Sequence, residues 1–113
     1  MNHNRKITIV FADQKLKKAF DELKKGKGAE PQLYQFINRA FDDLEKNPNI
    51  GMKIPKKLWP KDYIKKYDIN NLWKYDLPSG WRLIYTLKAN QLAVIAVVLE
   101  WFDHKEYERR FKY

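Results

Sequence analysis

Five side chains in the second half of the chain are of the types that could cleave a phosphodiester bond. Lys74 and Arg82 fall on one face of two predicted neighbouring strands, and His104, Lys105 and Tyr107 follow directly after a third. Because adjacent antiparallel strands bring such positions to one edge of a sheet, these long side chains could meet. Cations there could hold a phosphate of RNA while a base takes the proton of the neighbouring 2′ hydroxyl, which attacks the phosphorus without a metal ion. Histidine titrates near neutral pH unassisted, so His104 is the first choice for the acid or base.

Each of these residues also has an ordinary structural role open to it. Asp76 is predicted to lie opposite Arg82, where the two could form a cross-strand ion pair. Lys74 could be merely solvated, and His104 could serve only as part of a helix start. Tyr107 falls at helical spacing from a phenylalanine and could belong to the core. The pattern therefore indicates an anion-handling site and leaves the structural alternative open for each member.

Three stretches predict the strands that would position these residues. Residues 72–77 and 81–88 alternate in hydrophobicity with period two, and a Pro-Ser-Gly turn separates them. Residues 92–99 are apolar without a charge, which is typical of a strand covered on both faces. The three stretches therefore predict an antiparallel meander with the apolar run as its buried third strand.

A three-residue loop in the first hairpin sets the register of this meander. It places Asp76 opposite Arg82 and Lys74 opposite Ile84, and a slip by one residue would mix the two faces. In this register, four large side chains share the face that we expect to form the core: Trp73, Tyr75, Leu83 and Tyr85. The opposite face carries Lys74 and Arg82.

The remaining elements complete a single α+β domain over residues 1–113. Residues 7–11 predict an N-terminal strand that pairs at or beside the apolar strand and makes the sheet four-stranded. Apolar stripes at helical spacing predict a two-helix hairpin over 13–26 and 31–47, with a turn at Lys27-Gly28. The hairpin would cover the aromatic face of the sheet. A short C-terminal helix, capped by an aspartate, would close the chain.

Two segments carry clustered cations that could bind RNA. Residues 53–66 hold six lysines against one acid, Trp59, Tyr63 and the following Tyr67 are interleaved with them, and a short helix is expected around Tyr63. Within it we expect RNA contacts from four lysines: Lys56, Lys57, Lys65 and Lys66. The last helix ends in a further basic group, of which Arg109 and Arg110 are candidate RNA contacts, followed by Lys112. A solvated connector is the alternative for the lysine-rich segment.

Composition limits the classes of protein to which the chain can belong. The 113 residues include 44% hydrophobic residues, which suits one packed domain. The net charge of +9 favours an anionic partner such as nucleic acid. The absence of cysteine fits a cytoplasmic protein, and no apolar run exceeds eight residues, so we expect no membrane span. Neither a glycine-rich phosphate loop, a cluster with metal-ligand spacing nor a serine triad is present.

The order of the predicted elements resembles the RelE/ParE superfamily of toxins from type II toxin–antitoxin systems. The motifs that carry the resemblance are residues 72–77, residues 79–85 and the closing residues 103–107. The resemblance implies a RelE-like fold and a small acidic antitoxin that covers the basic site. RelE-type members cut messenger RNA on the ribosome without a metal or cofactor, whereas ParE-type members poison DNA gyrase.

The same resemblance assigns roles to the candidate residues. Lys74 and Arg82 correspond to phosphate-binding positions, His104 or Lys105 to the closing catalytic position, and Tyr107 to a helper. Asp76 departs from the family pattern, since RelE-type strands often have a second basic residue there. The closing motif is also one residue shorter than usual.

Three functions remain open at this point. An mRNA-cleaving toxin (an mRNA interferase) that acts on the ribosome is favoured. A gyrase-directed toxin of the same fold comes next, and a basic nucleic-acid-binding module without activity is third. Growth arrest on expression separates the first two from the third, and the fate of messenger RNA against DNA topology separates the first from the second.

Overall fold

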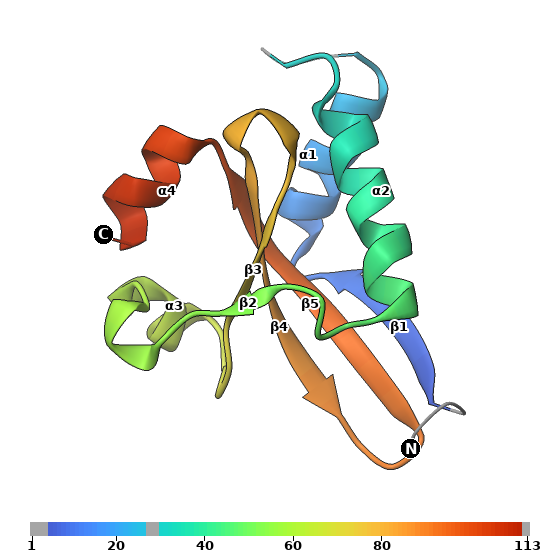
Figure 1. Cartoon of the computed structure of the whole chain (residues 1–113), viewed down its shortest axis with the longest axis vertical. Coiled ribbons are helices and arrows are strands. Elements are labelled where there is room, and N and C mark those ends of the chain that lie inside the picture. Colours follow the sequence, from blue (N-terminus) through green and yellow to red (C-terminus); the bar gives the residue numbers. More distant parts are fainter. Residues whose placement is uncertain (1–4, 27–29, 112–113) are drawn as a thin grey trace.

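The computed structural model describes residues 5–26 and 30–111 as a mixed five-stranded sheet with two pairs of helices (Figure 1). The strands lie in the order β1-β5-β4-β3-β2. Their bounds are Lys6–Phe11 for β1, Met52–Lys53 for β2, Trp73–Asp76 for β3, Arg82–Ala89 for β4 and Ala93–Phe102 for β5. The helices are α1 at Gln14–Lys24, α2 at Leu33–Lys46, α3 at Lys61–Lys66 and α4 at His104–Phe111.

The predicted meander is confirmed with its register. Asp76 pairs with Arg82 and Lys74 pairs with Ile84 in the antiparallel ladder of β3 and β4. The N-terminal strand β1 lies beside the apolar strand β5, as expected, and runs parallel to it. A fifth strand, β2, adds to the four predicted and pairs with β3. Because β2 contains only two residues, it has no alternation from which a sequence pattern could reveal it.

The hairpin of α1 and α2 covers one face of the sheet, as predicted. Ile37 of α2 and Leu83 and Tyr85 of β4 are fully buried in the core between them. Aromatic rings add to this core, with centroids 5.3 Å apart for Phe11 and Phe20. The start of α1 also follows the sequence, because the amide of Leu16 donates to the side chain of Asp13 at 2.8 Å. Helix α2, in contrast, begins two residues beyond the proline expected at its first position.

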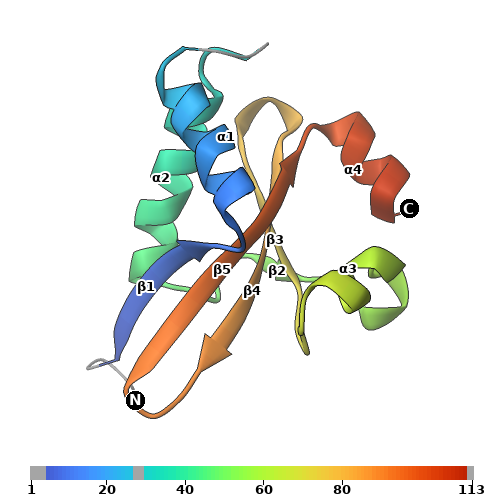
Figure 2. The ribbon, with the colours of Figure 1, turned by 180° about the vertical axis from the view of Figure 1, so that it is seen from behind.

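The opposite face, on which Lys74 and Arg82 were predicted to lie, is packed by α3 and α4, in line with the prediction that residues 92–99 are covered on both faces. Figure 2 shows the two helix pairs on opposite sides of the sheet. Ile84 of β4 and Leu99 of β5 are buried there against Tyr63 of α3 and against Tyr107 and Phe111 of α4. The sheet is therefore covered on both faces. Lys74 and Arg82 lie at the border of this second core, over the ring of Tyr107.

The turn between β3 and β4 brings the sheet close to the start of α4. Ser79 and Gly80 both adopt positive φ angles, 62° and 81°. A Cβ atom at Gly80 would lie 3.3 Å from the Cβ of His104, so a larger residue would crowd the helix start. Glycine thus serves both the turn and the close approach.

Two predictions concern residues that the structure does not describe. The turn at Lys27-Gly28 and the cation Lys112 lie outside the described ranges. Within those ranges, no helix has the length and apolar character needed to cross a membrane.

Candidate functional site

The two strand cations of the predicted site converge on one carboxylate. Lys74 Nζ lies 3.2 Å from Asp76 Oδ1, and Arg82 Nε lies 2.9 Å from the same oxygen. The Arg82 contact is an ion pair without hydrogen-bond geometry, since its buried Nε has no hydrogen-bond partner among the described residues. The lysine and arginine side chains are only 15% and 17% exposed, whereas that of Asp76 is 54% exposed. The cations are therefore held in place and the acid faces solvent.

His104 completes the contact between the sheet and α4. Its Nδ1 lies 3.3 Å from Nη2 of Arg82, and its Nε2 lies 3.2 Å from Oε1 of Glu108. A guanidinium has only donors, so Nδ1 must accept, and the ring is then neutral with its proton on Nε2, which can donate to Glu108. Asp103 supports this geometry, because its carboxylate accepts from the amide of Glu106 at 2.8 Å and caps the helix.

Tyr107 forms the floor beneath the two cations. It is 2% exposed and stacks on Phe111 with ring centroids 4.6 Å apart. Lys74 Nζ and Arg82 Cζ lie 5.6 and 5.7 Å from the centre of its ring, within range of cation–π attraction. Tyr107 is therefore a residue of the core, which was the structural alternative considered for it. Its ring also helps to position the two cations.

Lys105 is close to the cluster in sequence but makes no contact with it. The side chain is exposed on the first turn of α4, with no hydrogen bond or ion pair in the described part of the chain. Successive helical residues point about 100° apart, so Lys105 leaves the helix in a different direction from His104.

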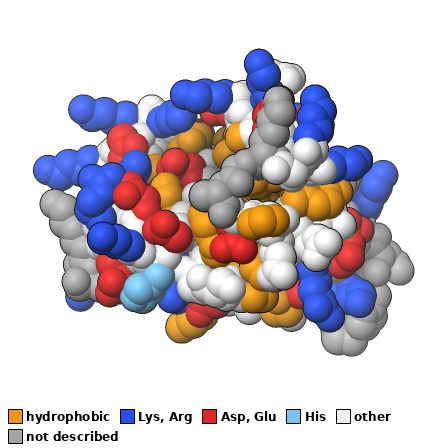
Figure 3. Space-filling model, turned by 90° about the horizontal axis from the view of Figure 1, so that it is seen from above, with side chains coloured by type: hydrophobic (Ala, Val, Ile, Leu, Met, Phe, Trp, Pro, Cys, Tyr) orange, Lys and Arg blue, Asp and Glu red, His pale blue; other side chains and the backbone are white. Residues whose placement is uncertain are grey.

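The charges of the cluster nearly cancel. With His104 neutral, the cluster holds the two cations Lys74 and Arg82 and two carboxylates, of which Asp76 contacts both cations and Glu108 contacts the histidine. Figure 3, viewed from above, shows acidic and basic side chains interspersed on the α4 side rather than one continuous basic patch. An incoming anion would therefore have to replace a carboxylate.

The six candidate RNA contacts do not form one surface. Lys56 and Lys57 are exposed on a 3₁₀ turn at Lys56–Leu58, and Lys65 and Lys66 are exposed on α3. Lys66 lies 3.9 Å from Asp13 at the start of α1. In contrast, Lys57 lines a hollow of about 500 Å³ together with Arg109 and Arg110 from the end of α4. The structure thus brings three of the six around one hollow.

Arg110 is part of an ion-pair network that sequence reasoning missed. Its Nη2 lies 2.8 Å from Asp62 and 3.9 Å from Glu100, and its guanidinium covers the ring of Tyr63. The hydroxyl of Tyr63 donates to Glu100 at 2.6 Å. Burial, and then the nearby charge of Glu100, raise the pKa of Tyr63 well above its ordinary value. This network joins α3, β5 and α4, which are distant in sequence.

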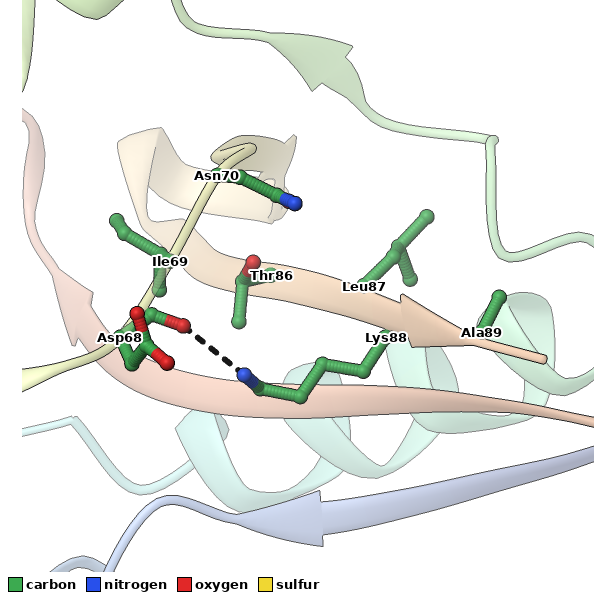
Figure 4. A pocket seen from close by; sticks show the side chains of 7 residues that line it. All are labelled: Asp68, Ile69, Asn70, Thr86, Leu87, Lys88 and Ala89. Atoms are coloured by element: carbon green, nitrogen blue, oxygen red, sulfur yellow. Dashed lines mark hydrogen bonds between the residues drawn. The ribbon is translucent and has the colours of Figure 1, made fainter.

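A second hollow, at the far end of β4, has a different character. It is about 350 Å³ in volume and lies between residues 68–70 and 86–89 (Figure 4). The ammonium group of Lys88 donates to the carbonyl of Asp68 at 2.9 Å. The ammonium group in this hollow is therefore already bound to a backbone carbonyl.

Comparison with known proteins identifies the family. The family model of the ParE toxin of the type II toxin–antitoxin system parDE matches residues 11–100. No curated protein and no solved structure matches the chain significantly. The matched span includes Lys74 and Arg82 and ends before His104 and α4. Because the match covers most of the 113 residues, the chain belongs to the ParE toxin family of type II toxin–antitoxin systems, within the RelE/ParE superfamily, and its family implies a cognate antitoxin as partner.

Proposed function

We propose that this toxin cleaves messenger RNA on the ribosome. The observation that carries the proposal is the contact between Arg82 and His104, 3.3 Å apart, with Lys74 bound to the same acid as Arg82. A cation that could bind a phosphate and an imidazole that could take a proton thus lie side by side, and these are the two groups that attack by a 2′ hydroxyl requires. The antitoxin would block this site by covering it.

In the proposed reaction, the 2′ oxygen forms a bond to the adjacent phosphorus and the bond to the leaving 5′ oxygen breaks. When Arg82 turns from Nδ1 of His104 to the phosphate, Nδ1 is free to accept the proton of the 2′ hydroxyl, and solvent protonates the leaving oxygen. The products are a 2′,3′-cyclic phosphate and a 5′ hydroxyl. Arg82 stabilises the negative charge that builds on the phosphate, because its planar donors match phosphate oxygens and it stays protonated. Lys74 adds a second positive charge.

Binding of the phosphate would exchange one anion for another. Asp76 holds both cations in the free protein, and its exposed carboxylate can turn towards solvent when a phosphate arrives. The exchange keeps the half-buried cations paired at all times, which avoids the cost of an unpaired buried charge. It also means that RNA must compete with Asp76 for the site.

Gyrase inhibition is the second candidate function. One observation favours it: the carboxylates of Asp76 and Glu108 offset the charges of Lys74 and Arg82, which weakens attraction for RNA. A toxin that binds another protein through this surface needs no exposed positive charge there.

Induction of the toxin in bacterial cells separates the two candidates. We expect growth arrest with new transcript 5′ ends inside coding regions, and with plasmid supercoiling unchanged. The same purified RNA without ribosomes should be cut far less. His104→Ala is the matched control, and it should remove the new 5′ ends. Altered plasmid topology without new transcript ends would contradict mRNA cleavage and favour gyrase.

A further inference from the structure

The hollow beside the end of α4 combines an aromatic side chain with cations from two elements. It is about 500 Å³ in volume, within the range of small-ligand sites, and Lys57, Trp59, Lys61 and Arg109 are among the residues that line it. The 3₁₀ turn and α3 contribute one wall, and α4 contributes the other. In Figure 1 the segment that contains α3 lies below α4 on the same side of the sheet.

Trp59 is held as a fixed side chain in this wall. Its indole N–H donates to the carbonyl of Ile54 at 2.8 Å, and Pro55 and Pro60 restrict the backbone on either side. The side chain is half-buried, so part of its surface faces solvent. A ring that is already positioned loses little conformational entropy when a flat ligand stacks on it.

The cations around Trp59 differ in whether a carboxylate already binds them. Arg110 is bound to Asp62, and Arg109 is bound to Glu106. Lys57 and Lys61 are exposed, and neither has an ion-pair partner among the residues that the structure describes. The two lysines are therefore the charges available to an incoming anion.

We infer that this hollow binds one nucleotide of single-stranded RNA, with its base stacked on Trp59 and its phosphate held by Lys57 and Lys61. The inference rests on the proposed function and extends it to a nucleotide of the same strand a few positions away from the cleaved phosphate. Stacking aromatics with adjacent cations are the usual means of holding single-stranded nucleic acid. An acidic peptide would use the lysines but has no group that requires the ring.

The position of the hollow suits one RNA strand that crosses both sites. Arg110 lies six residues after His104 in α4, a distance of about 9 Å along the helix axis. At roughly 3.4 Å per stacked nucleotide, this corresponds to about three nucleotides. The helix would thus lie along the strand, with the cleavage site at its start and the flanking nucleotide near its end.

Binding of a short RNA with 2′-O-methyl groups tests the inference without cleavage. Lys57→Ala combined with Lys61→Ala should weaken binding and reduce its salt dependence. Because both lysines hold the same phosphate, the variant neutralises one fewer phosphate charge, and the slope of log K against log[salt] should fall by about 0.7. Trp59→Leu should weaken binding roughly 5- to 150-fold at all salt concentrations. Lys15→Ala combined with Lys18→Ala removes two exposed lysines of α1 and should leave the slope unchanged. Thermal melting of each variant shows whether it is folded.

Three outcomes would overturn the inference. The first is no binding of the RNA to the parent, and the second is a parent-like affinity and slope in the Lys57 and Lys61 variant. The third is binding of polyglutamate that depends on the same two lysines while RNA binding does not. Cleavage by the parent is measured separately, so a failed nucleotide site with active cleavage leaves the proposed function intact. Conversely, RNA binding at Trp59 without cleavage would contradict the function and not the site.

Discussion

The two faces of the sheet are packed by different kinds of contact. The face under α1 and α2 is apolar and aromatic, with Ile37, Leu83 and Tyr85 fully buried. The face under α3 and α4 also has an apolar core, but ion pairs border it, among them those of Arg110 with Asp62 and Glu100. The candidate cleavage site lies only on this second face.

The difference shows how one sheet can separate stability from chemistry. The long hairpin fixes the sheet from one side, which leaves the short helix α4 to present polar groups at both of its ends. Its start carries His104 beside Arg82, and its end carries Arg110 beside Asp62. Changes on the first face should therefore reduce stability, whereas changes to the charged groups at the start of α4 should mainly alter binding and catalysis.

The largest stability effect is expected for Leu83→Ala on the first face. Leu83 is 0% exposed, so the substitution leaves a cavity and should cost about 2–5 kcal/mol in the free energy of unfolding. Leu92→Ala is the matched control, since Leu92 is 80% exposed and should lose little. Urea denaturation measures both. A loss below about 0.5 kcal/mol for Leu83→Ala would contradict its place in the core.

A smaller, pH-dependent loss of stability is expected for Tyr63→Phe on the second face. The hydrogen bond to the carboxylate of Glu100 should contribute roughly 1.5–3 kcal/mol at neutral pH. Because folding raises the pKa of Tyr63, its stabilisation is full below the ordinary tyrosine value of about 10 and is lost as the pH rises further. The variant should thus lose less stability than the parent between pH 9 and 11.

The control for this experiment is Tyr34→Phe, whose hydroxyl makes no hydrogen bond with any described residue. It should keep the alkaline slope of the parent. Equal slopes for the parent and Tyr63→Phe would show that the Tyr63 hydroxyl stays solvated, against the contact with Glu100.

The smallest effect is expected for Asp76→Asn, which should change RNA affinity by freeing the cations of the second face from their carboxylate. Loss of this carboxylate should tighten binding of a non-cleavable RNA up to about fivefold at low salt, since exposed ion pairs contribute up to about 1 kcal/mol. Asp42→Asn, an exposed acid of α2, is the control for net charge and should have less effect. Weaker binding by Asp76→Asn would mean that Asp76 orients Arg82 for RNA instead of competing with it.

The meander could be predicted from the sequence because alternation and a short turn fix its register. The pairing of Asp76 with Arg82 follows from that register, and the structure bears it out. The two-residue strand β2 could not be predicted, since it forms only where β3 offers an unpaired edge. The parallel direction of β1 also depends on the hairpin that follows it, a tertiary constraint that the strand residues do not carry.

The proximity of the candidate residues could be predicted from the sequence, whereas most of their individual contacts could not. The meander and the helix cap together imply that Arg82 and His104 approach each other, as they do. The place of Tyr107 beneath them was one of two alternatives, and burial decides it. The binding of Arg110 to Asp62 could not be foreseen, because the two lie 48 residues apart and neither belongs to a recurring motif.

Single-turnover cleavage of messenger RNA on programmed ribosomes is the most direct test of the proposal that Arg82 and His104 form the cleavage site. Arg82→Ala and His104→Ala should each slow cleavage about 10²–10⁴-fold, the usual effect of removing a positioned catalytic group, with melting temperatures close to that of the parent. Lys105→Ala is the matched control from the next position of α4 and should cut nearly as fast as the parent. If the Arg82 and His104 variants cut as fast as the parent, the assignment of the cleavage site is wrong.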